Sequence, residues 1–143
     1  MSHPQTFEDD DPALALLRDL ALAYPAAEVK VSHGRPAFFT APRGKVFAYF
    51  GGSLKVEGEW VPHDRCVMVL LDPDERAALV EDPRAFVPAY LGASGWLGLD
   101  LPDPAGDGAG GWDEVAELVD ASYRRTASAR LVAELDARPG PSA

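Results

Sequence analysis

The pattern of apolar and polar positions divides the chain into a helical start, a strand-rich middle and a helical end. Near the start, apolar side chains recur at helical spacing from Leu14 to Tyr24, directly after Asp11 and Pro12. Asp is a favoured N-cap residue and Pro a favoured first helical residue. The pattern therefore predicts a helix over residues 12–24.

The same signals predict two later helices. Asp72 and Pro73 repeat the helix-opening pair and Pro83 follows, which indicates a helix over residues 73–82. Further on, Val115, Leu118 and Val119 share one helical face, which indicates a last helix over residues 112–128. The segment before it, Pro102 to Gly111, is rich in Pro, Gly and Asp and is expected to be an exposed loop.

Short runs rich in β-branched and aromatic residues fill the middle of the chain. Strands are predicted at Val29–Ser32, Ala37–Ala41, Val46–Phe50, Leu54–Val56, Cys66–Leu71 and around Trp96–Leu101. Pro42-Arg43-Gly44 and Gly51-Gly52-Ser53 are expected to form turns between them. Connections this short leave no room for crossover helices, so the sheet should be antiparallel.

Together these elements predict one α+β domain over residues 11–130, with an antiparallel sheet of about five strands packed with three main helices. Residues 1–10 are expected to be an acidic flexible leader, and residues 131–143 the end of the last helix and a flexible tail. The Cys66–Leu71 run is apolar at every position, so it is expected at the centre of the sheet with both faces covered. The expected core includes Leu17, Val67, Val69, Trp96, Leu118 and Tyr123.

Composition limits the classes of function. The chain has 143 residues, the size of one domain, and a formal net charge of -10. A field of that sign disfavours general affinity for nucleic acid or anionic membranes. The longest uncharged stretch, residues 85–99, is too short to cross a bilayer, and the acidic start is unlike a signal peptide. A soluble cytoplasmic protein without a membrane partner is expected, and its single cysteine excludes an internal disulfide.

One stretch departs from this acidic background. Between Lys30 and Val56 the chain carries five cations and no carboxylate. Two of them, Arg43 and Lys45, flank the tip of a predicted hairpin and should project into solvent. Such a tip could contact phosphates as a wing, which is one hypothesis for the strip. The alternative is a sheet edge that charge protects against aggregation.

No catalytic motif accompanies the cations. His33 is expected to end a strand and bond a backbone group, His63 to be solvated in a polar turn, and Cys66 to be a buried, inert thiol. The histidines and the cysteine lack metal-ligand spacing, and Gly106–Gly111 lacks the Lys-Ser/Thr pair of a phosphate loop. The chain is therefore expected to have no enzymatic activity, metal or cofactor. The tryptophans assigned to packing are Trp60, Trp96 and Trp112.

Three segments occur together in a recognisable order. They are Ser32-His33-Gly34-Arg35-Pro36-Ala37-Phe38-Phe39, then Asp82-Pro83-Arg84-Ala85-Phe86 through Ala89-Tyr90-Leu91-Gly92 to Gly95-Trp96-Leu97, and finally Glu117-Leu118-Val119-Asp120-Ala121-Ser122-Tyr123-Arg124. At this spacing they resemble the MmcQ/YjbR-like family of small bacterial proteins, over about residues 10–130. The resemblance implies an α+β fold of the type grouped with secretion chaperones. It also implies a double-wing arrangement that has been proposed to bind DNA.

Three hypotheses of function follow. The first is non-enzymatic DNA binding through a basic hairpin wing, in which six residues contact phosphates: Lys30, His33, Arg35, Arg43, Lys45 and Lys55. The second is a module that binds a protein or peptide partner, for which a net negative charge is no handicap. The third is a small-anion-binding protein or an enzyme centred on His33, Arg35 and Tyr123.

Overall fold

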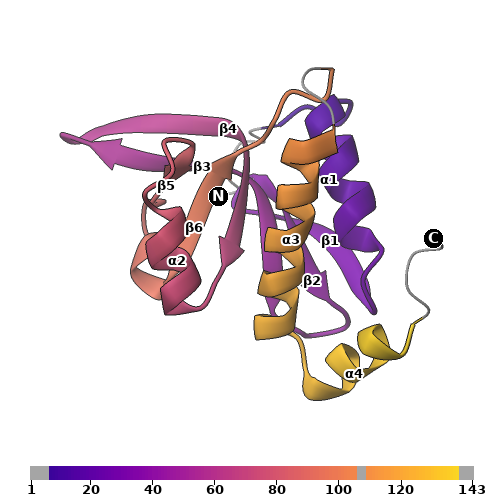
Figure 1. Ribbon diagram of the computed structural model, residues 1–143. Helices are drawn as coiled ribbons and strands as arrows, with labels where there is room; N and C mark the ends of the chain where they lie inside the picture. Colours follow the sequence, from indigo (N-terminus) through magenta and orange to yellow (C-terminus); the bar gives the residue numbers. More distant parts are fainter. Residues whose placement is uncertain (1–6, 106–108, 139–143) are drawn as a thin grey trace.

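The computed structural model describes residues 7–105 and 109–138. Figure 1 shows one sheet with two long helices, α1 and α3, lying side by side against it. The elements in chain order are α1 (Pro12–Leu22), β1 (Ala27–Ser32), β2 (Arg35–Thr40), β3 (Val46–Val56), β4 (Glu59–Leu70), α2 (Pro73–Leu79), β5 (Ala85–Phe86), the 3-10 helix η1 (Leu91–Ser94), β6 (Trp96–Asp100), α3 (Ala109–Thr126) and α4 (Ala129–Ala137).

The sheet confirms the predicted α+β class. Its strands lie in the order β1-β2-β3-β4-β6-β5, and every neighbouring pair is antiparallel. It has six strands, because the predicted strands Val46–Phe50 and Leu54–Val56 are parts of the single strand β3, while the two-residue β5, absent from the sequence prediction, pairs with β6. A fourth helix arises because α3 ends at Thr126, after which the Ser128 hydroxyl accepts a hydrogen bond from the amide of Leu131 and caps α4.

The predicted helix starts at the two Asp-Pro pairs are confirmed. The carboxylate of Asp11 accepts a hydrogen bond from the amide of Ala13, and that of Asp72 accepts from two amides of α2. The third helix begins at Ala109, so residues 109–111 belong to its first turn and not to the expected loop. The rest of the Gly-rich segment, residues 106–108, lies outside the described residues, as do residues 1–6 of the leader and residues 139–143 of the tail. No helix in the described ranges is long and apolar enough to cross a membrane.

The turn predicted at Gly51-Gly52-Ser53 is wrong. Strand β3 runs through this segment, and the register between β3 and β4 shifts between Phe50 and Gly52. Gly51 has a φ of 86°, a left-handed value that glycine adopts without strain, so the segment is a bulge that bends the strand. The chain reverses only at Glu57 and Gly58, whose φ angles of 53° and 83° fit a two-residue hairpin turn.

The main core lies between the sheet and the pair α1 and α3. From β4 it receives Val67 and Val69, and from α3 it receives Val119 and Tyr123. The side chains predicted to be buried are buried, with the exception of Leu118, which is only half-buried. The buried face of α3 is centred on the neighbouring positions 115, 119, 122 and 123, and this leaves Leu118 at its margin.

The opposite face of the sheet carries a second, smaller core. It consists of Cys66, Met68, Phe86 and Trp96, with Leu91 of η1 packed against it. Strand β4 is therefore covered on one face by helices and on the other by the connection between β5 and β6. This confirms the sequence prediction of a central strand with both faces covered.

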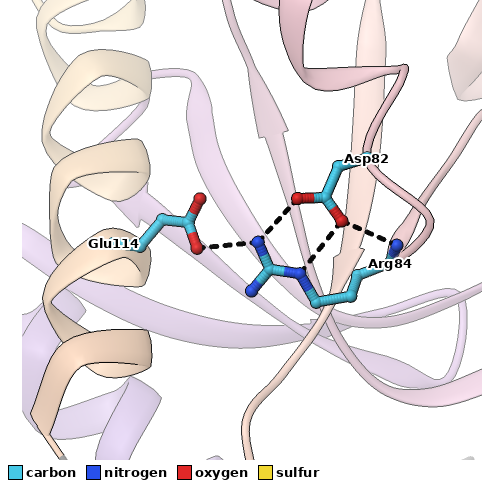
Figure 2. Close-up of polar contacts among 3 residues, drawn as sticks. All are labelled: Asp82, Arg84 and Glu114. Atoms are coloured by element: carbon cyan, nitrogen blue, oxygen red, sulfur yellow. Dashed lines mark hydrogen bonds and ion pairs between the residues drawn. The ribbon is translucent and has the colours of Figure 1, made fainter.

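An ion cluster fastens the segment just before β5 to α3. The guanidinium of Arg84 lies 2.7 Å from Oδ2 of Asp82 and 2.9 Å from Oε1 of Glu114 (Figure 2). The Asp82 carboxylate also accepts a hydrogen bond from the Arg84 amide at 2.8 Å. The bonds to Arg84 lower the pKa of Asp82 to about 2. The cluster links β5, and with it the second core, to the helical face of the molecule.

The hydroxyl of Ser122 joins α3 to two strands of the sheet, and its removal tests how α3 packs. Buried Ser122 donates a hydrogen bond to the carbonyl of Phe47 at 2.6 Å and accepts one from the amide of Leu70 at 2.9 Å. Ser122→Ala leaves both backbone groups unpaired, so we expect the free energy of unfolding to fall by about 1–3 kcal/mol in urea titrations. The exposed Ser94→Ala is the matched control and should unfold like the native chain. Equal stability of the two variants would contradict this assignment.

The Asp82 carboxylate should make stability depend on acid. Its pKa is lower in the folded chain than in the unfolded one, so its contribution is present above pH about 4 and is lost as the pH falls towards about 2. We expect Asp82→Asn to lower the free energy of unfolding at pH 7 and to change it little near pH 2. The exposed Asp19→Asn serves as control. Chemical unfolding followed across this pH range gives the measurement, and a pH-independent effect would contradict the assignment.

Candidate functional site

A cleft of about 630 Å³ opens on the face of the sheet that bears the smaller core. The β1–β2 turn forms one wall, the far part of the β3–β4 hairpin a second, and the segment before η1 a third. In Figure 1 that hairpin extends away from α1 and α3. The lining residues are Ser32, His33, Arg35, Tyr49, Ser53, Trp60, Met68, Pro88, Ala89, Tyr90 and Leu91.

Arg35 is the fixed cation of the cleft. It begins β2, and the following Pro36 favours an extended backbone at this position. Its Nη1 donates a hydrogen bond to the carbonyl oxygen of Gly51 at 2.9 Å. The bulge at Gly51 thus supplies the acceptor that orients the guanidinium, while the other N–H groups of this planar fork remain donors for a ligand.

Three aromatic residues line the cleft, namely Tyr49, Trp60 and Tyr90. The ring of Tyr49 meets Trp96 edge-on, with centroids 5.1 Å apart. At the rim, the rings of Trp60 and Tyr90 have centroids 5.9 Å apart, although their residues are 51% and 78% exposed. The amide of Ala89 donates to the carbonyl of Ser53 at 2.9 Å, which holds the segment before η1 against the hairpin.

Tyr90 also has a strained backbone. Its φ of 65° lies in the left-handed region, where a bulky residue costs free energy. Strain of this kind is typical of functional segments that the surrounding structure holds in place. At Tyr90 it presents an exposed ring beside Trp60.

The charge in the cleft is opposite to that of the protein. The described residues that line it include Arg35 and His33 but no Asp or Glu, whereas the chain as a whole has a net charge of -10. A further cation lies at the rim, because Nζ of Lys55 is 4.9 Å from the ring centroid of Trp60. Burial raises the pKa of Tyr49, so its hydroxyl stays protonated at neutral pH and can donate a hydrogen bond.

The structure brings together only some of the predicted phosphate-binding residues. His33 and Arg35 line the cleft and Lys55 stands at its rim. Lys30 is exposed on β1, with Nζ 4.7 Å from the ring centroid of Phe39.

Arg43 and Lys45 project into solvent from the β2–β3 connection, as the sequence predicted. That connection is at the other end of β2 from Arg35, and the five residue steps along the strand amount to about 17 Å. The two basic regions are therefore separate surfaces.

Two of the residues discussed from the sequence, Tyr123 and His63, lie elsewhere than expected, and a third, Cys66, is as expected. Tyr123 does not join His33 and Arg35, because it belongs to the main core, on the buried face of α3, and donates to the carbonyl of Pro25 at 2.8 Å. His63 is not in a solvated turn but in β4, where Nδ1 lies 2.7 Å from Oδ1 of Asp100. Cys66 is buried, as predicted, and burial raises its pKa, so it stays a thiol at neutral pH.

Sequence reasoning missed the aromatic part of the cleft. Trp60 was assigned to packing, and unlike Trp96 it is half exposed at the rim. Tyr49 and Tyr90 were not singled out, since strand periodicity alone does not reveal that the chain near residue 90 returns to the hairpin. Within the described ranges, no group of three or more His, Cys, Asp or Glu side chains could hold a metal ion.

The chain is thus a small α+β protein in which one antiparallel sheet carries helices on one face and the cleft on the other. The model of the YjbR family matches residues 22–125, most of the chain. The chain therefore belongs to the YjbR family, which confirms the resemblance of the three sequence segments. A search of curated proteins found no match to this chain.

Proposed function

We propose that this protein binds a small organic anion with a planar ring in the cleft beside Arg35, without catalysing a reaction. The observation that carries the proposal is the charge of the cleft. Its lining combines Arg35 and His33 with no carboxylate among the described residues, on a protein of net charge -10. A cation in a concave site of low dielectric attracts an anion more strongly than the same cation on a flat surface.

The anionic group would meet Arg35. One edge of its guanidinium is held by the carbonyl of Gly51, so little side-chain entropy is lost when the remaining N–H groups bind. A carboxylate or phosphate accepts two parallel hydrogen bonds from such a fork. The protonated hydroxyl of Tyr49 offers a further donor on the floor of the same cleft.

The planar part of the ligand would lie against the aromatic rim. Trp60 and Tyr90 are close to each other yet largely exposed, and large aromatic side chains left in water commonly mark binding surfaces. The volume of about 630 Å³ is in the usual range for small-molecule sites. No nucleophilic role falls to cysteine, since the only cysteine is a buried thiol.

The proposal predicts a charge requirement at one arginine. With anilinonaphthalene sulfonate, an aromatic anion whose fluorescence rises on binding, we expect saturable binding to the native chain. Arg35→Gln should weaken it by about tenfold or more, because a hydrogen bond to a charged group is lost. Arg43→Gln removes the same charge outside the cleft and should leave binding unchanged.

Trp60→Ala should also weaken binding of the same probe, because the rim loses one aromatic surface. Thermal melts of all three variants verify that each is folded. Equal affinity of the Arg35 and Arg43 variants, or probe binding that appears only on partial unfolding, would contradict the proposal.

DNA binding is the second candidate. The exposed positions of Arg43 and Lys45 on the β2–β3 connection favour it, since both side chains are free to reach phosphates. The longer β3–β4 hairpin is less suited to a second wing, because its tip carries Glu57 and Glu59. The basic surface that supports this candidate is therefore one short turn.

The corresponding prediction concerns salt. If this turn contacts phosphates, affinity for a fluorescent duplex should fall steeply with added salt, because each neutralised phosphate releases roughly 0.9 counterion. Replacing Arg43 and Lys45 together by Glu should abolish binding while the thermal melt stays unchanged. Arg35→Gln serves here as the control. Undetectable binding at low salt, or equal binding by the double variant, would reject the DNA candidate and leave the cleft proposal unaffected.

A further inference from the structure

Strand β1 is the long open edge of the sheet. It pairs with β2 on one side only, from Ala27 opposite Thr40 to Ser32 opposite Arg35. The turn between them consists of His33 and Gly34, with φ angles of 54° and 83°, as in a two-residue hairpin.

The register shows which backbone groups point away from β2. In a two-residue hairpin the flanking pair, Ser32 and Arg35, exchanges hydrogen bonds, and every second pair beyond it does the same. The bond from the amide of Ala41 to the carbonyl of Ala26, at 2.8 Å, fits this alternation at the far end. The N–H and C=O groups of Val29 and Val31 therefore point outward, and nothing in the described part of the chain covers them.

The side chains of this edge are self-complementary. Val29 and Val31 are 38% and 61% exposed on one face of the strand. Glu28 and Lys30 are exposed on the other face, on either side of Val29. The strand thus has an apolar stripe on one face, and one acid and one base at equal distances from a central valine on the other.

We propose that two copies of this chain associate edge to edge through antiparallel pairing of β1 with β1, about a two-fold axis at Val29. This register places Val29 opposite its own copy, where the two residues exchange both backbone hydrogen bonds. It places Glu28 of each copy opposite Lys30 of the other, which gives two cross-strand ion pairs. Val31 of each copy lies opposite Ala27 on the apolar face.

The charges favour a second copy in this register over other arrangements. A two-fold axis one residue along, at Lys30, would set two lysines opposite each other, and like charges directly opposite destabilise a strand pair. The ladder also has a natural end, because the amide of Ala27 already donates to the carbonyl of Tyr24 at 3.1 Å. An isologous contact requires self-complementarity of this kind, and an unrelated strand has no reason to match it.

The experiment is a charge exchange read by sedimentation velocity over a range of concentrations. We expect the native chain to show a reversible monomer–dimer equilibrium. Glu28→Lys alone and Lys30→Glu alone should each raise the dissociation constant by about tenfold to a hundredfold, because two attractive pairs become repulsive. The double variant, which restores opposite charges in exchanged positions, should dimerise like the native chain.

A mixture of the two single variants gives the sharpest readout. One chain then carries two lysines at the edge and the other two glutamates, so they should form a heterodimer although each alone is monomeric. Glu117→Lys, on the exposed face of α3, controls for the change in net charge and should not affect association. Val29→Pro removes the outward amide without touching the β1–β2 bonds and should abolish the dimer while thermal stability is retained.

Two outcomes would overturn the proposal. A native chain that stays monomeric at all accessible concentrations would reject it. A dimer that persists unchanged in both single charge variants would show that another surface associates. A failed dimer leaves probe binding in the cleft unaffected, so the two proposals are distinguishable.

Discussion

The positive φ of Gly51 is the local constraint on which the cleft-bearing face of the sheet depends. At that residue β3 bulges, so the strand bends and continues, and the following residues lengthen into a hairpin that extends past the β1–β2 turn. The same residue offers its carbonyl to Arg35. One backbone conformation, which a side chain at this position would strain, therefore both shapes the wall of the cleft and orients its cation.

The sequence predicted the features that depend on local signals and on the pattern of apolar and polar positions. The two Asp-Pro helix starts, the antiparallel order and the two-sided burial of Cys66–Leu71 follow from capping, short connections and unbroken apolar character. The bulge did not follow, because paired glycines signal a turn and a bulge equally well. Only the length of the partner strand, from Glu59 to Leu70, decides between them, and that is a tertiary fact.

The sequence predicted the chemical character of the candidate site but not which residues form it. The cation-rich stretch drew attention to His33 and Arg35, which share the cleft, and equally to Arg43 and Lys45, which do not. Closeness along the chain does not ensure closeness in space, since the two ends of β2 alone lie about 17 Å apart. The aromatic rim could not be predicted because Tyr90 lies in an irregular segment, where no periodic pattern indicates its position.

The two edges of the sheet differ in a way that limits how copies can assemble. Strand β5 has two residues, and the ion pairs of Arg84 hold it close to α3, so that edge is too short to template another strand. Of the two outermost strands, only β1 is long enough to accept one. A pair of copies joined through both β1 strands would have only the two-residue β5 as the outermost strand at each end, so its ends would offer no long strand for a further copy.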